Sequence, residues 1–498
     1  MIRNYRMLPT MLSAVLSLAF PGGKTSLAED HSFKTEVFVS GTSGYHTYRI
    51  PAVIVTPKGT LLAFCEGRKT SRSDHGDLDL VLRRSADGGK TWTSMQIVYE
   101  EGGDANITIG NPCPVVDQGT GRIWLPFCRN NDDVLVTFSD DEGKTWAKPR
   151  EITDSVKKSG WGWYATGPGV GIQLERGEHK GRLLIPCDHG VQIEGKRVMH
   201  SHVFYSDDQG QTWILGGTVD QHTDECQVVE LSDGTLMINM RNYWGRDGKQ
   251  PDKDRMRAVA ISRNGGATWE DLRFDETLIE PICQGSFLQY ATEQDTGHNP
   301  LLFSNPASKT TRHRLTVRLS QDEGKTWPVA KLLHEGPSAY SCLTVLPDGS
   351  IGCLYEGGEN DAYEKIIFVR FSLAASSKEK DVDMPVVVEI TGVKPPRTTR
   401  LPGFHRTKPA VIENHDTLTK TFGDAKATKI IGQVYFDRQV LVFFQWSGSG
   451  QDKLTYAIQN QNEEATVVFK FRAGRTRDLR PHAHLYAIRK DVAWRIAK

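Results

Sequence analysis

The sequence predicts an all-β protein in which short β units repeat along the chain and stack around a central axis. An eight-residue motif with the pattern S-x-D-x-G-x-T-W occurs five times, and a β-rich run precedes each copy. The Asp or Asn positions of successive copies lie 54 to 67 residues apart, a period typical of repeat architectures. Because a short β unit cannot bury its faces alone, several units must pack against one another. The copies are Ser85–Trp92, Ser139–Trp146, Ser206–Trp213, Ser262–Trp269 and Ser320–Trp327.

The motif has the composition of a stapled turn. Asp and Asn close turns through their side-chain oxygens, and Gly adopts a positive φ without steric cost. Thr and Trp suit a strand that begins just afterwards, and Trp buries a large area between neighbouring sheets. Only the fourth copy departs from the pattern, with Asn264 in place of Asp. We expect each repeat to be strand, turn, strand, and the motifs to be structural. The preceding runs are Leu80–Arg84, Val134–Phe138, His202–Tyr205, Arg257–Ile261 and Thr316–Leu319.

Length and charge narrow the class of protein. The chain has 498 residues, which is too long for one ordinary core and fits one large repeat domain plus something smaller. Its 61 basic and 61 acidic residues balance. Zero net charge argues against a general binder of nucleic acid or of acidic membranes. Any recognition of an anion must therefore be local.

Residues 1–28 have the features of a signal peptide. Arg3 and Arg6 give a positive start, Met7–Phe20 is a short apolar run, and small residues precede a cleavage site near Ala28. We expect export to the periplasm or secretion after cleavage, and an uncleaved anchor is the alternative. No other stretch approaches the roughly 18 apolar residues of a membrane span, so none is expected in the mature chain.

The cysteine pattern favours buried thiols. None of the eight forms a C-x-x-C pair, which argues against a zinc site, and several lie in apolar, strand-like runs. Disulfides can form in an exported protein, but their pairing cannot be read from sequence. We expect no metal and no cofactor. The cysteines are Cys65, Cys113, Cys128, Cys187, Cys226, Cys283, Cys342 and Cys353.

Three arginines near strand ends point to a carboxylate site. Arg49 lies in Tyr48-Arg49-Ile50-Pro51, where a buried guanidinium needs an anionic partner. Taken alone, this arginine fits a structural salt bridge equally well. Arg241 and Arg312 lie near strand ends of other repeats. In a radial fold such strand ends converge on one face, and three converging guanidiniums would match a carboxylate.

In these segments the sequence resembles the exo-sialidases (neuraminidases) of glycoside hydrolase family 33, which are six-bladed β-propellers with Asp-box (BNR) repeats. The resemblance runs from about Tyr45 to Phe371 and follows the family's order. It implies a propeller domain over residues 29–373. The segments that carry it, besides the five motifs, are YRIP, LLAFCEGR, SDHGDLDLVLRRS, ATGPGVGIQL, ECQVVELSDGTLMINMRN and AYSCLTVLPDGSIGCLYEGG.

The resemblance implies a role for each of eight residues. Arg49, Arg241 and Arg312 would clamp the carboxylate of sialic acid, and Arg68 would lie near the 4-hydroxyl of the sugar. Asp74 would be the acid/base, Tyr340 the nucleophile, and Glu225 the carboxylate that activates it. Glu356 would steady the first arginine.

Considered one at a time, several of these residues could have a structural role instead of a catalytic one. Asp74 lies in a loop rich in Ser and Gly, where Asp usually forms turns, and Asp77 and Asp79 compete with it. Tyr340 alone suits a packed aromatic side chain, and Glu225 alone suits a solvated loop acid. Asp74 is preferred because its offset from Leu82-Arg83-Arg84 matches the family, whereas Asp79 alternates with strand residues. The resemblance across the complete set supports the other assignments.

The chemistry explains the residue types. Sialic acid carries a carboxylate on its anomeric carbon, so an anionic nucleophile would meet like charge. A phenol is neutral at pH 7, with a pKa of about 10, but needs a base within hydrogen-bond reach. The resemblance implies a retaining exo-α-sialidase with a covalent tyrosyl-sialyl intermediate. Expected substrates are sialylated glycans, glycoproteins or glycolipids, with ganglioside catabolism among the implied processes.

Other functions remain open at this point. A trans-sialidase, or a hydrolase of a related keto-sugar acid, would use the same residues. A sialic-acid-binding propeller without catalysis would need only the arginines, so Asp74, Glu225 and Tyr340 speak against it. Oligomeric state and linkage preference cannot be read from the sequence.

Three further segments remain to be interpreted. Ser159–Leu174 carries Trp161, Trp163 and Tyr164, which could line a sugar subsite or cap the core of a blade. Residues 374–384 are small and charged and suit a linker. Residues 385–498 have strand-like runs separated by turn residues, which predicts a small β-rich domain. The runs are Val386–Ile390, Lys429–Tyr435, Val440–Trp446, Leu454–Ala457 and Thr466–Phe471.

Overall fold

A computed structural model describes residues 32–244, 253–290 and 299–373, and in the C-terminal part 386–391, 408–413, 415–423, 430, 434, 439–461, 464–476 and 478–497. The chain divides into two compact units, Met1–Leu373 and Ala374–Lys498. The predicted signal peptide and the predicted linker lie outside the described residues. Each unit is described by itself.

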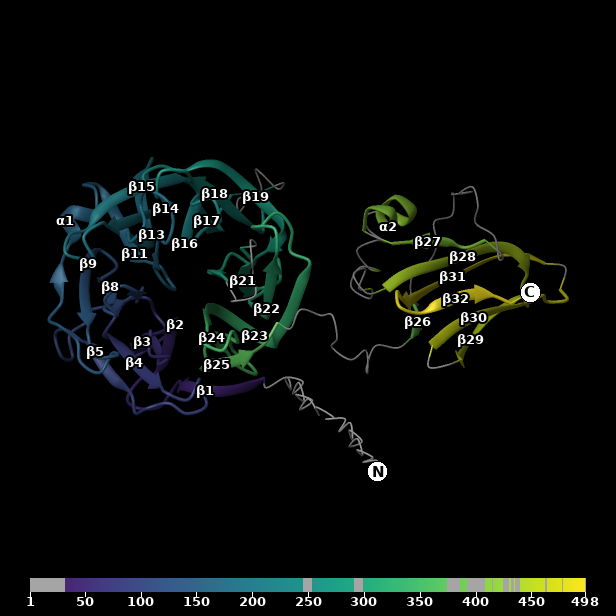
Figure 1. The fold of residues 1–498 in the computed structure, drawn as a ribbon, viewed down its shortest axis with the longest axis horizontal. Helices are drawn as coiled ribbons and strands as arrows, with labels where there is room; N and C mark the ends of the chain where they lie inside the picture. The colour runs from purple at the N-terminus through teal and green to yellow at the C-terminus, as the bar shows by residue number, and fades with distance from the viewer. Residues whose placement is uncertain are drawn as a thin grey trace, which may run out of the picture. The chain divides into compact units, whose positions relative to one another are not determined.

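The first unit is a ring of antiparallel sheets around a central axis, which is a β-propeller (Figure 1). Four sheets have four or five strands each. They are β2 (Thr47–Val55), β3 (Leu61–Arg68), β4 (Leu78–Ser85) and β5 (Gln96–Tyr99); β6 (Ile109–Gly110), β7 (Val115–Val116), β8 (Ile123–Arg129), β9 (Asp133–Ser139) and β10 (Arg150–Glu151); β11 (Trp161–Thr166), β12 (Ile172–Gln173), β13 (Leu183–Ile193), β14 (Lys196–Ser206) and β15 (Ile214–Gln221); and β16 (Thr223–Glu230), β17 (Leu236–Asn242), β18 (Met256–Ser262) and β19 (Glu270–Ile279). A short helix, α1 (Thr153–Val156), follows β10.

The fifth sheet of the ring has seven strands and closes the circle. Its 17-residue strand β23 pairs with β22 through its first half and with β24 through its second half, so two groups of strands share it. Because the two groups form one continuous sheet, the predicted number of six blades stays a prediction. Its strands are β1 (Phe33–Val39), β20 (Ser286–Gln289), β21 (Leu301–Pro306), β22 (His313–Ser320), β23 (Val329–Val345), β24 (Ile351–Gly357) and β25 (Lys365–Phe371).

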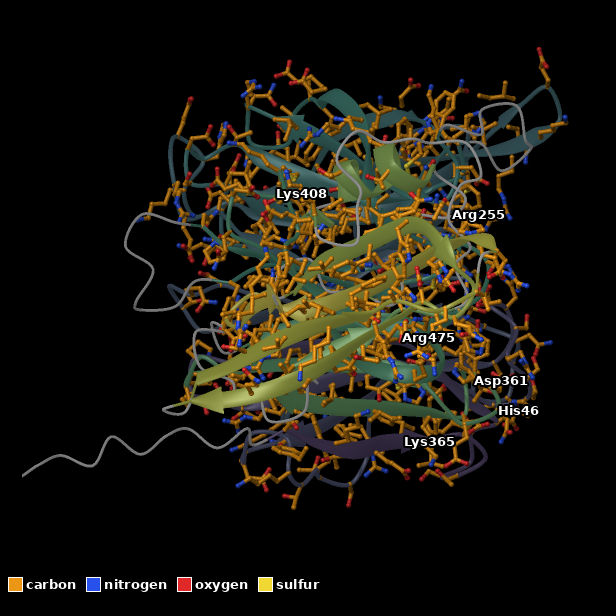
Figure 2. All side chains as sticks on the ribbon, turned by 90° about the vertical axis from the view of Figure 1, so that its right-hand side faces the viewer. His46, Arg255, Asp361, Lys365, Lys408 and Arg475 are labelled. Carbon is orange, nitrogen blue, oxygen red and sulfur yellow. The ribbon has the colours of Figure 1, made fainter. Side chains whose placement is uncertain are left out.

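The first strand of the chain closes the ring onto the last. β1 pairs antiparallel with β25, from Phe33 opposite Arg370 to Val39 opposite Lys365 (Figure 1). Lys365 Nζ also donates to Glu36 Oε1 at 2.5 Å on this strand pair (Lys365 is labelled in Figure 2). The sheet that begins with β20 is thus completed from the other end of the domain.

The inner strands are buried on both faces. All eight residues of β3 and all eight of β16 are buried, because each sheet is covered by its two neighbours. The hydrophobic core accordingly runs between sheets: Trp92, in the first motif, packs on Phe368 of β25, with ring centres 5.4 Å apart. Trp146, in the second, packs on Phe64 of β3 at 5.7 Å. These two motif tryptophans therefore pack their sheets onto the sheet before them in the ring.

The five motifs are structural turns, as predicted. In the second copy Asp141 accepts hydrogen bonds from the backbone N–H and the hydroxyl of Thr145, at 2.8 and 2.6 Å, and Ser139 Oγ accepts from Gly143 N at 3.0 Å. Gly143 has a positive φ of 72° and approaches Leu62 of the preceding sheet so closely that a Cβ would collide with it. No motif residue lines the cavity described below.

The expected strand start at the end of the motif is only partly right. β15 begins directly after Trp213 and β19 directly after Trp269, but β5 begins four residues after Trp92. β10 likewise begins four residues after Trp146. The motif Thr already gives its backbone N–H to the Asp side chain, so it does not donate to a strand ladder.

All eight cysteines are buried and free, which confirms the expected thiols. Burial raises the pKa of the Cys128 thiol to about 12, so it stays protonated at neutral pH. Burial also raises the pKa of the Cys342 thiol to about 12. In the part of the chain that the structure describes, no helix has both the length and the apolar character to cross a bilayer.

The second unit is a small β-rich domain, as predicted. A four-stranded and a three-stranded sheet share a core that includes Trp446, which is 7% exposed and donates to Asp452 Oδ2 at 3.0 Å. Most of the predicted strand Lys429–Tyr435 lies outside the described residues. The elements are β26 (Val387–Glu389), β27 (Ala410–Ile412), α2 (His415–Phe422), β28 (Gln439–Ser449), β29 (Lys453–Gln461), β30 (Glu464–Arg472), β31 (Leu479–Arg489) and β32 (Ala493–Ile496).

The motif geometry predicts the effect of changing Asp141. Asp141→Ala removes the acceptor of two hydrogen bonds and should lower the stability of the propeller by about 1 kcal/mol. Asp141→Asn should cost much less, because Asn264 makes the corresponding contacts with Thr268 at 2.9 and 2.8 Å. The urea midpoint of the propeller transition measures both. Equal midpoints for Asp141→Ala and the unchanged protein would show that the hydrogen bonds from Thr145 to Asp141 contribute no stability.

Candidate active site

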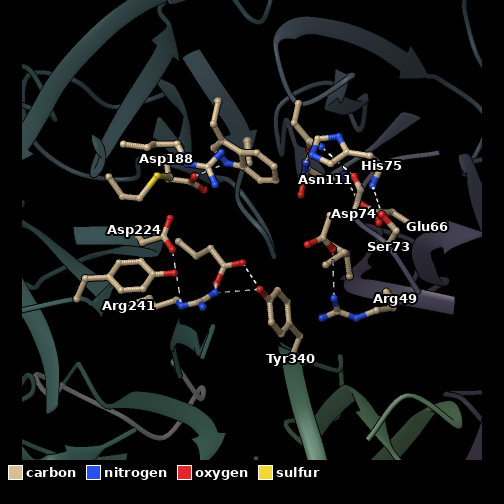
Figure 3. A pocket seen from close by; sticks show the side chains of 18 of the residues that line it. Arg49, Glu66, Ser73, Asp74, His75, Asn111, Asp188, Asp224, Arg241 and Tyr340 are labelled. Carbon is tan, nitrogen blue, oxygen red and sulfur yellow. Dashed lines mark hydrogen bonds and ion pairs between the residues drawn. The ribbon is translucent and has the colours of Figure 1, made fainter. Parts of the chain in front are cut away.

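The first unit contains a cavity of about 1250 Å³, and side chains from several sheets converge on it (Figure 3). Six of the eight predicted site residues line it. Glu356 is bound to Arg49, and Arg312 lies over the ring of Tyr340. In Figure 3, Arg49, Arg241 and Tyr340 lie on one side of the cavity, across from Asp188, Asn111 and His75.

Tyr340 forms a hydrogen-bonded group with a carboxylate and a guanidinium. Its hydroxyl, from β23, donates to Glu225 Oε1 on β16. Arg241 Nη1, from β17, donates to the same hydroxyl at 3.2 Å and to Glu225 Oε2 at 2.8 Å. Burial, and next the charge of Glu225, raise the pKa of Tyr340 well above its ordinary value. The phenol therefore holds its proton in the free protein, with an acceptor already in contact.

The three predicted clamp arginines surround the ring of Tyr340. The guanidinium of Arg49 lies 4.9 Å from the ring centre, and that of Arg312 lies 5.6 Å from it. Arg241 contacts the hydroxyl end. Arg312 is not among the residues that line the cavity, but its Nη1 donates to the hydroxyl of Tyr363, which does line it, at 2.8 Å. The convergence inferred from sequence is therefore present, with Arg312 turned to one side.

Glu356 is a buried carboxylate that accepts hydrogen bonds from Arg49 and from the backbone next to it and at Tyr340. Its carboxylate is fully buried and accepts from Arg49 Nε at 3.1 Å and Arg49 Nη2 at 3.3 Å. The backbone N–H groups of Ile50 and Tyr340 donate to the same carboxylate at 2.9 and 3.1 Å. Four donors satisfy a charge that would be costly to bury alone. Arg49 thus has the anionic partner that its buried position requires.

Irregular strands aim the site residues. Ile50 has a φ of 61°, a strained conformation for a β-branched residue, and its N–H turns out of the β2–β3 ladder to Glu356. Similar irregularities occur at Tyr340 and Glu225. A bulge frees a residue from strand pairing and redirects its side chain. The pairing register shifts between Arg49 and Ala52 on β2, between Ser338 and Ser341 on β23, and between Thr223 and Cys226 on β16.

Arg68 is held by Glu66 on the same strand. Arg68 is 1% exposed, and its Nε and Nη2 donate to Glu66 Oε2 at 3.0 and 2.6 Å. The other oxygen of Glu66 accepts the backbone N–H of Asn111 at 2.9 Å. Arg68 Nη1 then lies 2.9 Å from Asp74 Oδ1. The fixed guanidinium therefore presents one edge to the cavity and to Asp74.

Asp74 is the exposed carboxylate of the site. Its side chain is 56% exposed and contacts both Arg68, at 2.9 Å, and Arg49, at 3.4 Å. Partial burial acts to raise its pKa, but the two arginines outweigh this effect and lower it. Asp74 is therefore ionised in the free protein. The competing Asp77 and Asp79 form ion pairs with Lys69 and do not line the cavity.

A second group of carboxylates lies beside Glu225. Asp224 is 3.7 Å from Arg241 Nε, and burial together with the charge of Glu225 raises its pKa to about 6, although Arg241 opposes the shift. Asp188 is 1% exposed and accepts from Trp163 Nε1 at 2.9 Å. Burial, and next Asp224 and Glu225, raise the pKa of Asp188 well above its ordinary value. Burial and the neighbouring carboxylates thus favour the protonated form of both side chains.

The aromatic residues of Ser159–Leu174 were expected either to line a sugar subsite or to cap the core of a blade. The segment forms strand β11, in which Trp163 lines the cavity and Tyr164 is fully buried in the core. Trp161 stacks on His189, with ring centres 3.4 Å apart, and packs against the same core. The core-facing alternative is therefore confirmed for Tyr164 and Trp161, whereas Trp163 faces the cavity and its contact with a sugar stays a prediction.

Several residues of the site were not predicted from the sequence. Glu66 lies two positions before Arg68, and this spacing places both side chains on one face of a strand. The sequence therefore carried a signal for the pairing of Glu66 with Arg68. Asp224 precedes Glu225 directly. Tyr363 and Asp188 had no comparable signal. Among the described residues, no group of three or more His, Cys, Asp or Glu side chains is placed to hold a metal ion.

Comparison with known proteins identifies the family. Residues 59–353, more than half of the chain, match the family described as "BNR repeat-like domain". This chain belongs to the BNR-repeat sialidases of glycoside hydrolase family 33. The match spans the sheets that carry most of the site.

Individual relatives agree with this assignment. A sialidase of Micromonospora viridifaciens is 35% identical over 365 residues, covering 69% of this chain and 54% of that protein. A sialidase of Bacteroides fragilis is 31% identical, covering 66% of this chain and 63% of that protein. The chain thus spans just over half to just under two thirds of the length of these two relatives. The solved structure of a Hadza microbial sialidase is 31% identical, with a TM-score of 0.61 over 68% of each chain.

The carboxylates beside Glu225 predict a pH dependence of stability. Asp224 has an ordinary pKa of 3.8 and a pKa of about 6 in the folded protein, so folding favours its protonated form. Its contribution to stability is complete below about pH 4 and is lost as the pH rises through about 6. Asp224→Asn removes this titration, so the variant should gain melting temperature relative to the unchanged protein between pH 4 and 7.

Calorimetry at several pH values measures this difference. Asp220→Asn is the matched control, because Asp220 is an exposed carboxylate on β15. Parallel curves for Asp224→Asn and the unchanged protein would contradict the raised pKa.

Proposed function

We propose that this protein is a retaining exo-α-sialidase that hydrolyses terminal sialic acid from glycoconjugates through a covalent bond to Tyr340. The observation that carries the proposal is the contact of a neutral phenol with a buried carboxylate, Glu225, with three guanidiniums around the phenol ring. Sialidases with a tyrosine nucleophile are an established exception among glycosidases that use two carboxylates.

The arginines would bind the carboxylate of the substrate. Arg49, Arg241 and Arg312 offer paired donors that match carboxylate geometry. Arg312 would exchange its contact with Tyr363 for the ligand. Glu356 holds Arg49 in place through two hydrogen bonds, so this guanidinium needs little reorganisation on binding. The anomeric carbon would then lie next to the Tyr340 oxygen.

In the first step the Tyr340 oxygen attacks the anomeric carbon and Glu225 accepts the phenol proton. The bond to the leaving oxygen breaks, and Asp74 gives that oxygen a proton. Asp74 is ionised in the free site, so it must gain a proton first. The substrate carboxylate supplies the reason: its charge offsets Arg49, which lowers the pKa of Asp74 in the free protein.

In the second step water attacks the anomeric carbon and the bond to Tyr340 breaks. Asp74 accepts a proton from the water, and Glu225 returns its proton to the phenolate. Two inversions give net retention, and Tyr340 and Glu225 regain their starting states. Asp74 ends this step protonated and releases its proton to solvent when the product leaves, which returns it to the ionised form of the free site. Asp74 serves as acid and then as base, which suits its exposure at the edge of the cavity.

Hydrolysis is favoured here over binding alone, because a lectin would need the arginines but neither Asp74 nor the Tyr340–Glu225 pair. Transfer of the sialyl group to a sugar, or hydrolysis of a related keto-sugar acid, would use the same residues. Product analysis with lactose present separates hydrolysis from transfer. The proposal includes sialylated glycoproteins or glycolipids as substrates and export directed by residues 1–28.

Release of fluorophore from an aryl α-sialoside tests the proposed function. Tyr340→Phe should abolish turnover while the substrate still binds, because the nucleophilic oxygen is lost and the arginines remain. Tyr99→Phe is a matched control, since its hydroxyl contacts Glu101 away from the cavity. Normal turnover in Tyr340→Phe would remove this residue from the mechanism, and inactivity of the unchanged protein would refute the function.

Binding of free sialic acid tests the clamp. Arg312→Ala should weaken the affinity measured by calorimetry by about 2–5 kcal/mol, the cost of losing one partner of a buried charge pair. Arg314→Ala is the control, because Arg314 is 53% exposed and pairs with Glu335 at the surface. Equal affinities for the two variants would contradict a role for Arg312 in binding.

A further inference from the structure

The cavity is larger than one sugar residue needs. Its volume of about 1250 Å³ exceeds the roughly 300–1,000 Å³ that encloses a drug-sized ligand. The proposed function occupies the side that carries Arg49, Arg241 and Tyr340. The opposite wall is built by β11 and by the hairpin of β13 and β14, and none of its residues takes part in the mechanism.

Trp163 is the fixed centre of this wall. Its indole N–H donates to the buried Asp188 at 2.9 Å, which sets the plane of the ring. His75 meets the ring edge-on, with centres 5.9 Å apart and planes at 90°. A side chain held on two sides in this way offers a preformed surface to a ligand.

Arg197 lies on this surface. Its guanidinium is 5.5 Å from the centre of the Trp163 ring, and its aliphatic stem runs along β13. The stem fits because residue 190 is glycine: a Cβ there would lie 2.9 Å from Cγ and Cδ of Arg197. Lys196, beside it in the hairpin, also lines the cavity. Among the described residues, neither Lys196 nor Arg197 forms an ion pair, and both are exposed.

The position of this wall relative to Asp74 gives the direction of a bound chain. Asp74 is the proposed donor of a proton to the leaving oxygen, and His75 follows it directly. A leaving group that departs beside Asp74 therefore meets His75, then Trp163, then Arg197. The clamp arginines hold the other part of the substrate.

We propose that Trp163, Arg197 and Lys196 form a second subsite that selects an anionic leaving group next to the cleaved sialic acid. This inference rests on the proposed function and names its substrate class: glycans in which a carboxylate or sulfate follows the cleaved bond. A second sialic acid supplies a carboxylate there, and a sulfated sugar supplies a sulfate.

Charge and geometry both favour an anion over a neutral sugar. The guanidinium covers part of the indole face on which a neutral sugar would stack, and offers N–H donors in its place. Asp188, the carboxylate of this wall, has a pKa raised mainly by burial and is engaged by Trp163, so it adds little negative charge. The unpaired cations therefore dominate the local potential.

The test compares kcat/KM on three substrates: a neutral aryl α-sialoside, an α2,8-linked disialyl glycan and a sialyl glycan sulfated on the adjacent sugar. Arg197→Gln keeps hydrogen-bonding capacity but removes the charge. It should lower the ratio of anionic to neutral kcat/KM by about tenfold, the effect of losing one charged hydrogen bond. Added salt should reduce the same ratio in the unchanged protein. A loss on the disialyl glycan alone assigns the site to a carboxylate, and a loss on the sulfated glycan alone assigns it to sulfate.

Two further variants separate charge from placement. Gly190→Ala leaves every charge in place but displaces the Arg197 stem, and should lower the same ratio. Lys144→Gln, an exposed lysine of the second turn motif, should leave the ratio unchanged. An unchanged ratio in Arg197→Gln, or an equal loss on all three substrates, overturns the subsite while the sialidase proposal stands. Failure of the unchanged protein to cleave the aryl sialoside overturns both.

Discussion

The buried carboxylate of Glu356 is the contact on which the site and the closed ring both depend. It joins β24, in the last sheet, to Arg49 and Ile50 of β2, in the first, and to the backbone of Tyr340 in β23. One side chain therefore holds Arg49, the strained residue Ile50 in β2, and the candidate nucleophile Tyr340. Removing one partner of a buried ion pair typically costs about 3–5 kcal/mol, because the remaining charge stays buried. Loosening this contact would thus disturb fold and function together.

The site concentrates charge that the chain as a whole cancels. Glu356, Glu66 and Glu225 engage arginines in buried pairs, whereas Asp74 is more than half exposed. Its contacts with the arginines are the ones that an incoming anion can replace at the lowest cost, since solvent already screens them. The buried pairs keep the guanidiniums in place during that exchange. In the proposed mechanism, binding of the substrate carboxylate and protonation of Asp74 are therefore coupled electrostatically.

Much of the fold could be read from local sequence, and the site only in part. The turn motifs identify themselves because each completes its hydrogen bonds within eight residues. The need of Arg49 for an anionic partner follows from desolvation alone, and the family resemblance supplied that partner. Tyr363 and Asp188 could not be found, because their roles arise from contacts with residues distant in the sequence: Arg312 for one and Trp163 for the other. Bulges that redirect strand residues also leave no simple periodicity.

The pairing of β1 with β25 has a consequence for biosynthesis. Phe33 emerges from the ribosome first, and Arg370, opposite it, follows roughly 340 residues later. At about 5–20 residues per second, the first strand stays without its neighbour for on the order of tens of seconds. An unpaired, partly apolar strand is open to wrong partners during that time. The late synthesis of β25 therefore delays closure of the ring, and protection of β1 from mispairing during that time would favour correct folding.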